Sequence, residues 1–381
     1  MKRTSLSLGV AGLALLVLGA CDAPTVPSPA DSPAKDEELS RLVEAMGFRG
    51  DMVQDFGDYV LVEEDIMITK AQLRSATSHR TSDPMGPRFQ YRTTNLVGNT
   101  KVNQITVDLS GLASQPAWQT AAATALAHWS GITDSHVKMV QGSPADITVS
   151  TTCTASNVAA FASFPSAGNP GSTVYVNTCF AYSTSAAQKL HNMVHEFGHT
   201  LGFRHSNYTQ LGESAGTEGA VHIYGTPTSG NASGSVMNGG TALNSWAGFA
   251  ASDLTAARSI YPLPVPVITS VTNSGGYPLI TWNAVSGATS YTVSLITYNT
   301  INGQYQGRWF SSLTNTAGTS FLDTNNAWTG AYTCSSGYDD ERLGRESGRW
   351  YEYSVQAHFP NGTSNRDAAR YYAPIAQEGC W

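Results

Sequence analysis

The sequence contains little charge. Only 13% of its 381 residues are Asp, Glu, Lys or Arg, and the formal net charge is −7. It has no basic patch, so nothing indicates a nucleic-acid partner. It also lacks a long helical or heptad array. Gly, Ser, Thr and Asn are plentiful instead, a composition typical of secreted proteins rich in loops and strands, and the length predicts two or three structural units.

A long hydrophobic run is missing at the N-terminus. Residues 8–18 are apolar and follow Lys2 and Arg3, but this stretch is too short to span a bilayer comfortably as a permanent helix. A signal peptide over residues 1–20 fits better. The stretch ends in LGAC, which resembles a bacterial lipobox and implies cleavage before Cys21 and lipidation of this cysteine. The alternative is an ordinary signal peptide with a chance cysteine near its cleavage site.

Cysteine is also scarce, and its count is odd. If Cys21, one of the five, carries lipid, the other four form two local pairs, Cys153 with Cys179 and Cys334 with Cys380. A disulfide within each pair would stabilise the protein by roughly 2–4 kcal/mol and would belong in an oxidising compartment. The cysteines therefore predict a protein of the bacterial cell envelope, attached to the membrane through Cys21, or a secreted one.

The stretch HEFGHTLGFRH, residues 195–205, contains the candidate metal ligands and the candidate general base. His195 and His199 are four residues apart, so on a helix they share one face and can chelate one ion. Gly202 accepts a positive φ and can end the helix sharply, which lets the chain bend back and present His205 as a third ligand. Three protein ligands with an open fourth position describe a catalytic zinc ion. Glu196 cannot bind the same ion comfortably, but it can act as general base on a zinc-bound water.

This stretch resembles the metzincin clan of zinc endopeptidases, whose pattern is HExxHxxGxxH followed by a methionine turn. The Ser-Val-Met sequence that ends at Met237 is similar to that turn, in which a thioether packs beneath the zinc histidines without binding the ion. Gly239 stands where two branches of the clan have a tyrosine, so no tyrosine is expected on the zinc ion. Together with YVLVEEDI upstream, these motifs most resemble the bacterial dual-action HEIGH metallopeptidases, with Phe197 in place of the isoleucine. His191, one turn before His195, is interpreted as a helix-surface residue and not as a ligand.

The residues around this stretch predict the layout of an α/β zinc-protease domain. Apolar periodicity indicates a helix over 114–132, the zinc helix from about Ser185 and a closing helix within 243–262. Strands are expected over 101–111, 136–141, 145–152, 158–164 and 172–178. The resemblance implies that the edge strand of this sheet binds substrate in extended form, and several strands are candidates for that edge.

A pro-segment is predicted over residues 36–92, after a Pro- and Ser-rich tether over 21–35. It contains one helical pattern and one β-rich run, too little for a stable domain alone. It has no cysteine, so a thiolate cannot block the zinc ion. We hypothesise that Asp65 occupies the open zinc position in the precursor; the alternative is an ordinary strand-end acid. Processing could occur in the arginine-containing stretch 71–92, where no single cut site is defined.

The last part of the chain is predicted to be all-β. Behind a proline linker at 263–267, alternating apolar residues over 268–381 resemble a fibronectin type III-like sandwich, with Trp282 among its core residues. It contains no catalytic constellation. The acidic run at 339–341 could hold calcium, but a solvated loop is the preferred interpretation, so calcium is unsupported. The sandwich could bind substrate, carbohydrate or the envelope, or merely space the enzyme from its membrane.

The predicted fold is therefore α+β, with a metzincin-like zinc protease domain over 93–262 and a C-terminal all-β sandwich. The expected activity is hydrolysis of peptide bonds of proteins outside the cytoplasm, by a monomer with one catalytic zinc ion. The alternative is a cell-surface binding protein or adhesin with a degenerate protease domain. The retained Glu196 argues against this alternative, because zinc binding alone would not need that acid.

Overall fold

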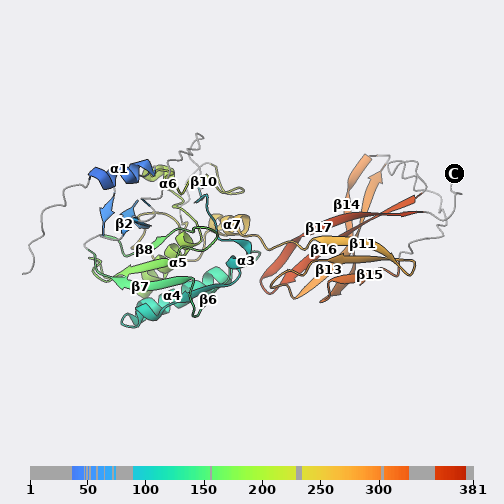
Figure 1. The fold of residues 1–381 in the computed structure, drawn as a ribbon, viewed down its shortest axis with the longest axis horizontal. Coiled ribbons are helices and arrows are strands. Elements are labelled where there is room, and N and C mark those ends of the chain that lie inside the picture. Colours follow the sequence, from blue (N-terminus) through green and yellow to red (C-terminus); the bar gives the residue numbers. More distant parts are fainter. Residues whose placement is uncertain are drawn as a thin grey trace, which may run out of the picture.

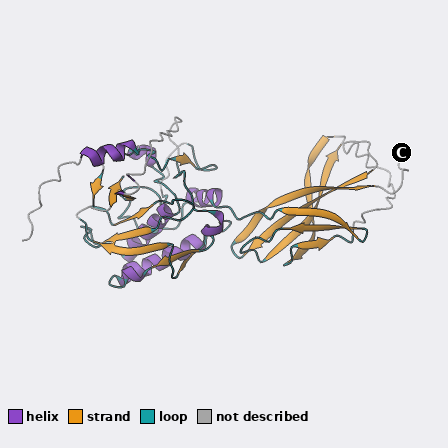
Figure 2. Ribbon diagram, in the orientation of Figure 1, coloured by secondary structure: helices purple, strands orange, loops and turns teal. Residues whose placement is uncertain are grey.

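The structure is a computed structural model, and the residues it describes are 37–46, 48, 50, 53–56, 59–63, 65–70, 73, 89–154, 157–228, 234–301, 304–325 and 348–374. The predicted signal peptide and tether, Cys21, Cys334, Cys380 and the acidic run at 339–341 lie outside these residues. Among the described helices, none is long and apolar enough to cross a membrane. The described chain forms an α/β unit followed by an all-β unit (Figure 1, Figure 2), which confirms the predicted fold class.

One eight-stranded sheet runs through the α/β unit in the order β1-β2-β3-β8-β9-β7-β5-β6. Five of its strands lie after residue 92, namely β5 (Ile105–Asp108), β6 (Met139–Gln141), β7 (Ile147–Thr152), β8 (Ala160–Ser163) and β9 (Thr173–Asn177). β6, β5, β7 and β9 run parallel to one another, whereas β8 pairs antiparallel with β9. β8 is therefore the edge strand of this group, which the sequence left undecided.

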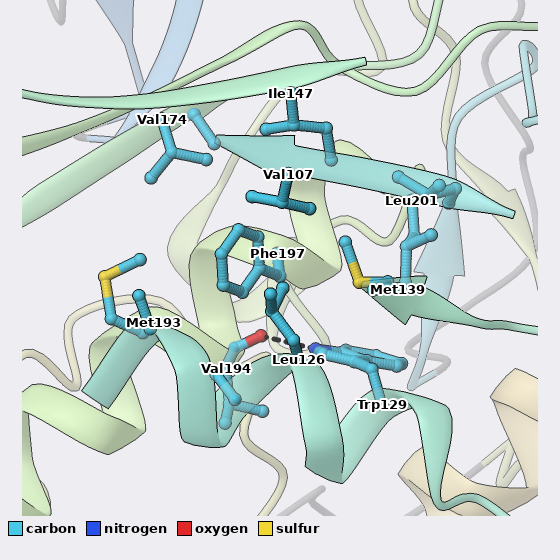
Figure 3. Packing of buried hydrophobic residues seen from close by; sticks show 14 of the residues in the cluster. Val107, Leu126, Trp129, Met139, Ile147, Val174, Met193, Val194, Phe197 and Leu201 are labelled. Atoms are coloured by element: carbon cyan, nitrogen blue, oxygen red, sulfur yellow. Dashed lines mark hydrogen bonds between the residues drawn. The ribbon is translucent and has the colours of Figure 1, made fainter. Parts of the chain in front are cut away.

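Two long helices cover one face of this sheet. They are α4 (Pro116–Ser130) and α5 (Ala186–Thr200), and they pack against each other. Figure 3 shows Phe197 of α5 between the strand valines and the side chains of α4. The indole N–H of Trp129 donates to the carbonyl oxygen of Val194 over 3.0 Å. Apolar packing and this buried hydrogen bond together fix α5 against the sheet.

The N-terminal segment forms a helix and a small antiparallel meander. Its elements are α1 (Glu37–Ala45), β1 (Gln54–Asp55), β2 (Tyr59–Val62) and β3 (Ile66–Thr69). Val43 and Val60 are fully buried in a core that these elements share with Phe164. β3 pairs parallel with β8, with Ile66 opposite Ala162. The segment thus extends the catalytic sheet at its edge strand.

Six short elements complete the α/β unit. They are β4 (Tyr91–Arg92), α3 (Asn99–Val102), η2 (Ser110–Leu112), α6 (Tyr208–Leu211), β10 (Val221–His222) and α7 (Ala251–Ile260). The strand predicted over 101–111 is wrong at its start, because α3 ends at Val102 and buries that side chain. α7 begins where the Asp253 carboxylate accepts a hydrogen bond from the Ala250 N–H at 3.0 Å.

The all-β unit is a sandwich of two antiparallel sheets. One contains β11 (Ile268–Ser274), β12 (Tyr277–Trp282) and β15 (Ser320–Leu322), and the other β14 (Gln304–Thr316), β13 (Ser290–Ile301), β16 (Gly348–Phe359) and β17 (Gly362–Pro374). Trp282 is buried between them and contacts the ring of Tyr291. The hydroxyl of the buried Tyr353 donates to Asp323 over 2.8 Å. Alternating inward residues therefore build this core, as the sequence pattern predicts.

The sandwich contacts the α/β unit through the turn between β16 and β17. Asn361 donates through Nδ2 to the carbonyl oxygens of Ile132 (3.2 Å) and Ser135 (2.8 Å). Its own carbonyl oxygen accepts from the N–H of Asp134 at 3.0 Å. Hydrogen bonds between the two units therefore supplement the covalent connection through the linker.

Candidate metal centre

The zinc helix α5 presents His195, Glu196 and His199 from its C-terminal half. A reciprocal cap defines its start, since Ser185 Oγ accepts from the Gln188 N–H at 3.3 Å and the Gln188 side chain accepts from the Ser185 N–H at 2.7 Å. Both histidines are buried, with exposed fractions of 4% and 0%. The helical spacing places their rings in contact, with centroids 4.6 Å apart.

Gly202 turns the chain back toward the helix. Its φ is +92°, and a Cβ at this position would lie 2.8 Å from Thr93 Oγ1. Glycine is therefore required both for the backbone conformation and for the close approach of Thr93. The turn brings His205, which is 1% exposed, to within 5.0 Å of His199 between ring centroids. The three predicted ligands therefore lie together.

Each of the three imidazoles makes a hydrogen bond through Nδ1 and directs Nε2 toward one point. The Nδ1 partners of His195, His199 and His205 are the carbonyl oxygens of Val236 (2.7 Å) and Phe203 (2.8 Å) and the carboxylate of Glu213 (2.5 Å), respectively. A carbonyl oxygen only accepts, so the first two rings carry their proton on Nδ1 and keep a lone pair on Nε2. These two Nε2 atoms are 3.0 Å apart. Lone pairs facing each other at this distance fit a shared cation between them.

Asp65 of the N-terminal segment completes the cluster. One ligand atom from each of the four residues, Asp65 and the three histidines, lies within 4.8 Å of the others. An Asp65 oxygen is 3.3 Å from His195 Nε2 and 3.1 Å from His205 Nε2. Burial alone would raise the pKa of Asp65, but the neighbouring histidines hold it well below its ordinary value. Three imidazole nitrogens and one carboxylate oxygen are a donor set that suits zinc.

Glu196 lies beside this cluster without joining it. It is 2% exposed, and its Oε2 has no hydrogen-bond partner among the described residues. Burial, followed by the negative charge of Asp65, raises the pKa of Glu196 well above its ordinary value. It lines a cavity of about 330 Å³ that also contacts Asp65, His191, Val158 and Thr241. A carboxylate of raised basicity thus faces a space next to the metal ligands.

Met237 lies in a tight turn beneath α5. It is 1% exposed, and a Cβ at Gly198 would collide with its sulfur atom. The turn is held by Asp253, which accepts from the Val236 N–H at 3.0 Å and from the Ser235 hydroxyl at 2.6 Å. Since the carbonyl oxygen of Val236 is also the Nδ1 partner of His195, this turn orients a predicted metal ligand. Sequence reasoning found Met237 but not the role of Asp253, which lies in the first turn of α7.

Two charged residues near His205 were missed by sequence reasoning. Glu213 accepts from its Nδ1, and Arg204 is fully buried beside both. The Arg204 guanidinium forms an ion pair with Glu63 of the N-terminal segment and lies 3.9 Å from Glu213. None of these three charges belongs to a periodic pattern, so the sequence offered no signal for their meeting.

The prediction that His191 lies on the helix surface is wrong. It is 6% exposed, and its Nε2 lies 3.0 Å from the hydroxyl oxygen of Thr241. The segment after the methionine turn covers it, since Gln188 and Asn192 of the same helix also donate to the carbonyl oxygens of Leu243 and Ala242. Burial, followed by the nearby His195, lowers the pKa of His191 to about 4. It lies one turn from the metal cluster and contributes no atom to it.

The remaining predicted site residues are cysteines. Cys153 and Cys179 form a disulfide, with Cα atoms 4.8 Å apart. This bond connects the end of β7 with the chain just after β9, upstream of the zinc helix. Cys21, Cys334 and Cys380 lie outside the described residues.

Comparisons with known proteins identify the family of the chain. The sequence profile described as "dual-action HEIGH metallo-peptidase" matches residues 60–261, more than half of the chain. Among solved structures, one of myroilysin shares 17% identity, covers 42% of this chain and 80% of its own, and has a TM-score of 0.30. A fibronectin type III-like protein from Clostridium thermocellum shares 21% identity and covers 30% of this chain and 95% of its own, with a TM-score of 0.18. No curated protein sequence matches the chain.

Proposed function

Because the chain belongs to the dual-action HEIGH metallopeptidase family and is a zinc metalloprotease, we propose that it is an endopeptidase acting on proteins outside the cytoplasm, with Glu196 as its general base. His195, His199 and His205 would hold the ion. Bound zinc supplies Lewis acidity and lowers the pKa of a coordinated water. The observation that carries this assignment is the convergence of the three Nε2 atoms, two of them from rings whose Nδ1 bonds a carbonyl oxygen.

Glu196 would move the proton. Its free Oε2 and its position on the cavity wall support the role of a base that takes the proton of the attacking water. The same carboxyl group would then return the proton to the departing amine. Its raised pKa supports the first transfer, because a buried carboxylate of raised pKa takes up a proton more readily than an exposed carboxylate does.

The precursor would be latent because its N-terminal segment covers the site. Asp65 lies among the metal ligands, and β3 pairs with β8, the edge strand on which an extended substrate would add. We place the activating cut before Phe89. Gln90 donates to Asp253 over 2.6 Å, and the N–H of Arg204 donates to the carbonyl oxygen of Tyr91 over 2.9 Å, so these residues support the metal site. The arginines at 74, 80 and 88 remain as candidate cut sites.

Export would follow from the N-terminal signal and lipidation of Cys21. The Cys153–Cys179 disulfide supports an oxidising compartment. Mass spectrometry of the mature N-terminus tests both steps at once. A diacylglyceryl-modified Cys21 marks the precursor as a lipoprotein, whereas a new N-terminus between residues 74 and 89 marks the activated enzyme.

The catalytic proposal is tested with casein as substrate and the variant Glu196→Gln. We expect clearing that a chelator abolishes, and a loss of turnover of about 10²–10⁴-fold in the variant, because general-base catalysis contributes that much. Zinc content measured by mass spectrometry should stay at one ion per chain, since Glu196 is not a ligand. Full activity in the variant contradicts the role of Glu196. Zinc binding with no cleavage of any tested protein would favour an adhesin instead.

A further inference from the structure

The third histidine is supported differently from the other two. His195 and His199 donate through Nδ1 to carbonyl oxygens, whereas His205 contacts the carboxylate of Glu213 at 2.5 Å. Glu213 follows α6, and it is 9% exposed. A carboxylate is a stronger acceptor than a carbonyl oxygen, and as an Nδ1 partner it makes the opposite nitrogen a better electron donor to a metal.

Arg204 holds the surroundings of Glu213 in place. Its Nη1 donates to the carbonyl oxygens of Ala215 (2.8 Å) and Gly219 (3.1 Å), which belong to the loop that begins at Glu213. The guanidinium lies 4.7 Å from the ring centre of Tyr208 in α6. The buried side chain of Arg204 thus fixes the loop at several points. Arg204 also directly precedes His205 in the sequence.

The same arginine connects this loop to the N-terminal segment. Glu63 forms an ion pair with Arg204 Nη2, and its other oxygen accepts from the Ser214 N–H at 2.8 Å. Glu213 therefore does not have to neutralise Arg204 alone while the N-terminal segment is present. One of its oxygens bonds His205, and its other oxygen lies 3.9 Å from the arginine.

We propose that Glu213 is a positioning residue for the metal ligand His205, which orients the imidazole with Nε2 toward the zinc ion and strengthens it as a donor. The proposal rests on the proposed zinc site. Partners of this kind determine ring orientation and basicity, and their removal usually costs about 10–100-fold in metal affinity. Glu213 belongs neither to the cavity wall nor to the cluster of Asp65 and the three histidines, so its effect passes through His205.

The test measures zinc affinity of the unprocessed chain by competition with a chromogenic chelator. We compare Glu213→Gln with Glu218→Gln, which removes a carboxylate from the same loop at a position with no contact to His205. The dissociation constant should rise about 10–100-fold in the first variant and stay unchanged in the second. The visible spectrum of the cobalt-substituted protein should shift in Glu213→Gln only, because the donor properties of His205 change.

A second variant separates positioning from folding. Glu213→Asp keeps a negative charge near Arg204 but is one methylene too short for the 2.5 Å contact with His205. We expect its metal-free form to melt at the wild-type temperature while its zinc affinity falls as in Glu213→Gln. Wild-type affinity and an unchanged cobalt spectrum in Glu213→Asp would overturn the proposal. If no form of the chain bound zinc, the proposed function itself would fail, a result clearly different from a selective loss in the Glu213 variants.

Discussion

The α/β unit carries the N-terminal segment at one end and the sandwich at the other. The two contacts differ in the kind of groups that form them. The N-terminal segment inserts the hairpin between β2 and β3 into the metal site, where Asp65 meets the three histidines and Glu63 meets Arg204. The sandwich touches the unit through Asn361 and neighbouring backbone atoms at a surface turn. The first contact consists of buried charges, and the second mainly of hydrogen bonds between neutral groups, with one more from the Thr363 N–H to the exposed Asp134 carboxylate at 3.2 Å.

This difference decides what each segment can control. A buried ion pair that loses one partner leaves an uncompensated charge, so the loss is costly and the contact is close to all-or-none. A hydrogen bond between neutral groups at a partly exposed turn contributes about 0.5–1.5 kcal/mol and can be replaced by water, and the exposed Asp134 carboxylate can be solvated in the same way. The N-terminal segment is therefore suited to regulating the site, and the sandwich contact to holding two units in register.

Among the variants of the two segments, Asp65→Ala should have the largest effect. Without this carboxylate in the metal cluster, the unprocessed chain should gain peptidase activity on the order of 100-fold, because an intramolecular ligand acts at high effective concentration. The rate is measured on fluorescent casein while gel electrophoresis confirms that the chain stays uncut. Asp55→Ala is the matched control, since the exposed Asp55 pairs with the half-buried Lys70 on the same meander. Equal latency in the two variants would contradict the switch.

Glu63→Gln should weaken the docking of the N-terminal segment. The variant removes the close ion-pair partner of the fully buried Arg204 and leaves Glu213, 3.9 Å away, to compensate the charge, so the cost should reach at most about 3–5 kcal/mol. Chemical denaturation of the unprocessed chain measures this loss, and limited proteolysis shows whether the segment detaches first. Lys70→Met, which removes the exposed pair with Asp55, should cost less than about 1 kcal/mol. If both variants lose the same stability, burial does not distinguish these ion pairs.

Asn361→Ala should have the smallest effect. It removes two hydrogen bonds to the backbone of the α/β unit and should lower the stability of the interface by about 1–2 kcal/mol. Differential scanning calorimetry should show the sandwich and the α/β unit melting less cooperatively, with the casein rate unchanged. Asn315→Ala, on an exposed part of β14, is the control. A large loss of peptidase activity in Asn361→Ala would show that the sandwich contact reaches the active site after all.

Local spacing made the metal ligands predictable. His195 and His199 need only a helix to meet, and Gly202 needs only a left-handed turn to return the chain toward His205. Met237 was found because it follows these residues in the expected order. The histidines and the turn follow from sequence distance, which the chain displays directly, whereas Met237 follows from the resemblance to the metzincin clan.

The supporting residues could not be found in this way. Glu213, Arg204 and Glu63 meet because a loop, the chain after α5 and the N-terminal hairpin converge, and no periodicity records that convergence. The burial of His191 likewise depends on Thr241, fifty residues further along the chain. The identity of β8 as the edge follows from the strand order, which is a property of the complete sheet.

The contact between Gly198 and Met237 has a consequence for how this enzyme can vary. Any side chain at residue 198 would enter the space of the methionine sulfur and approach the ring of Trp129 to 3.2 Å. A larger residue in the zinc helix would therefore have to appear together with a smaller one in the turn. The glycine between the two helical histidines and the methionine downstream constitute a single steric unit, and protein engineers should change them as a pair.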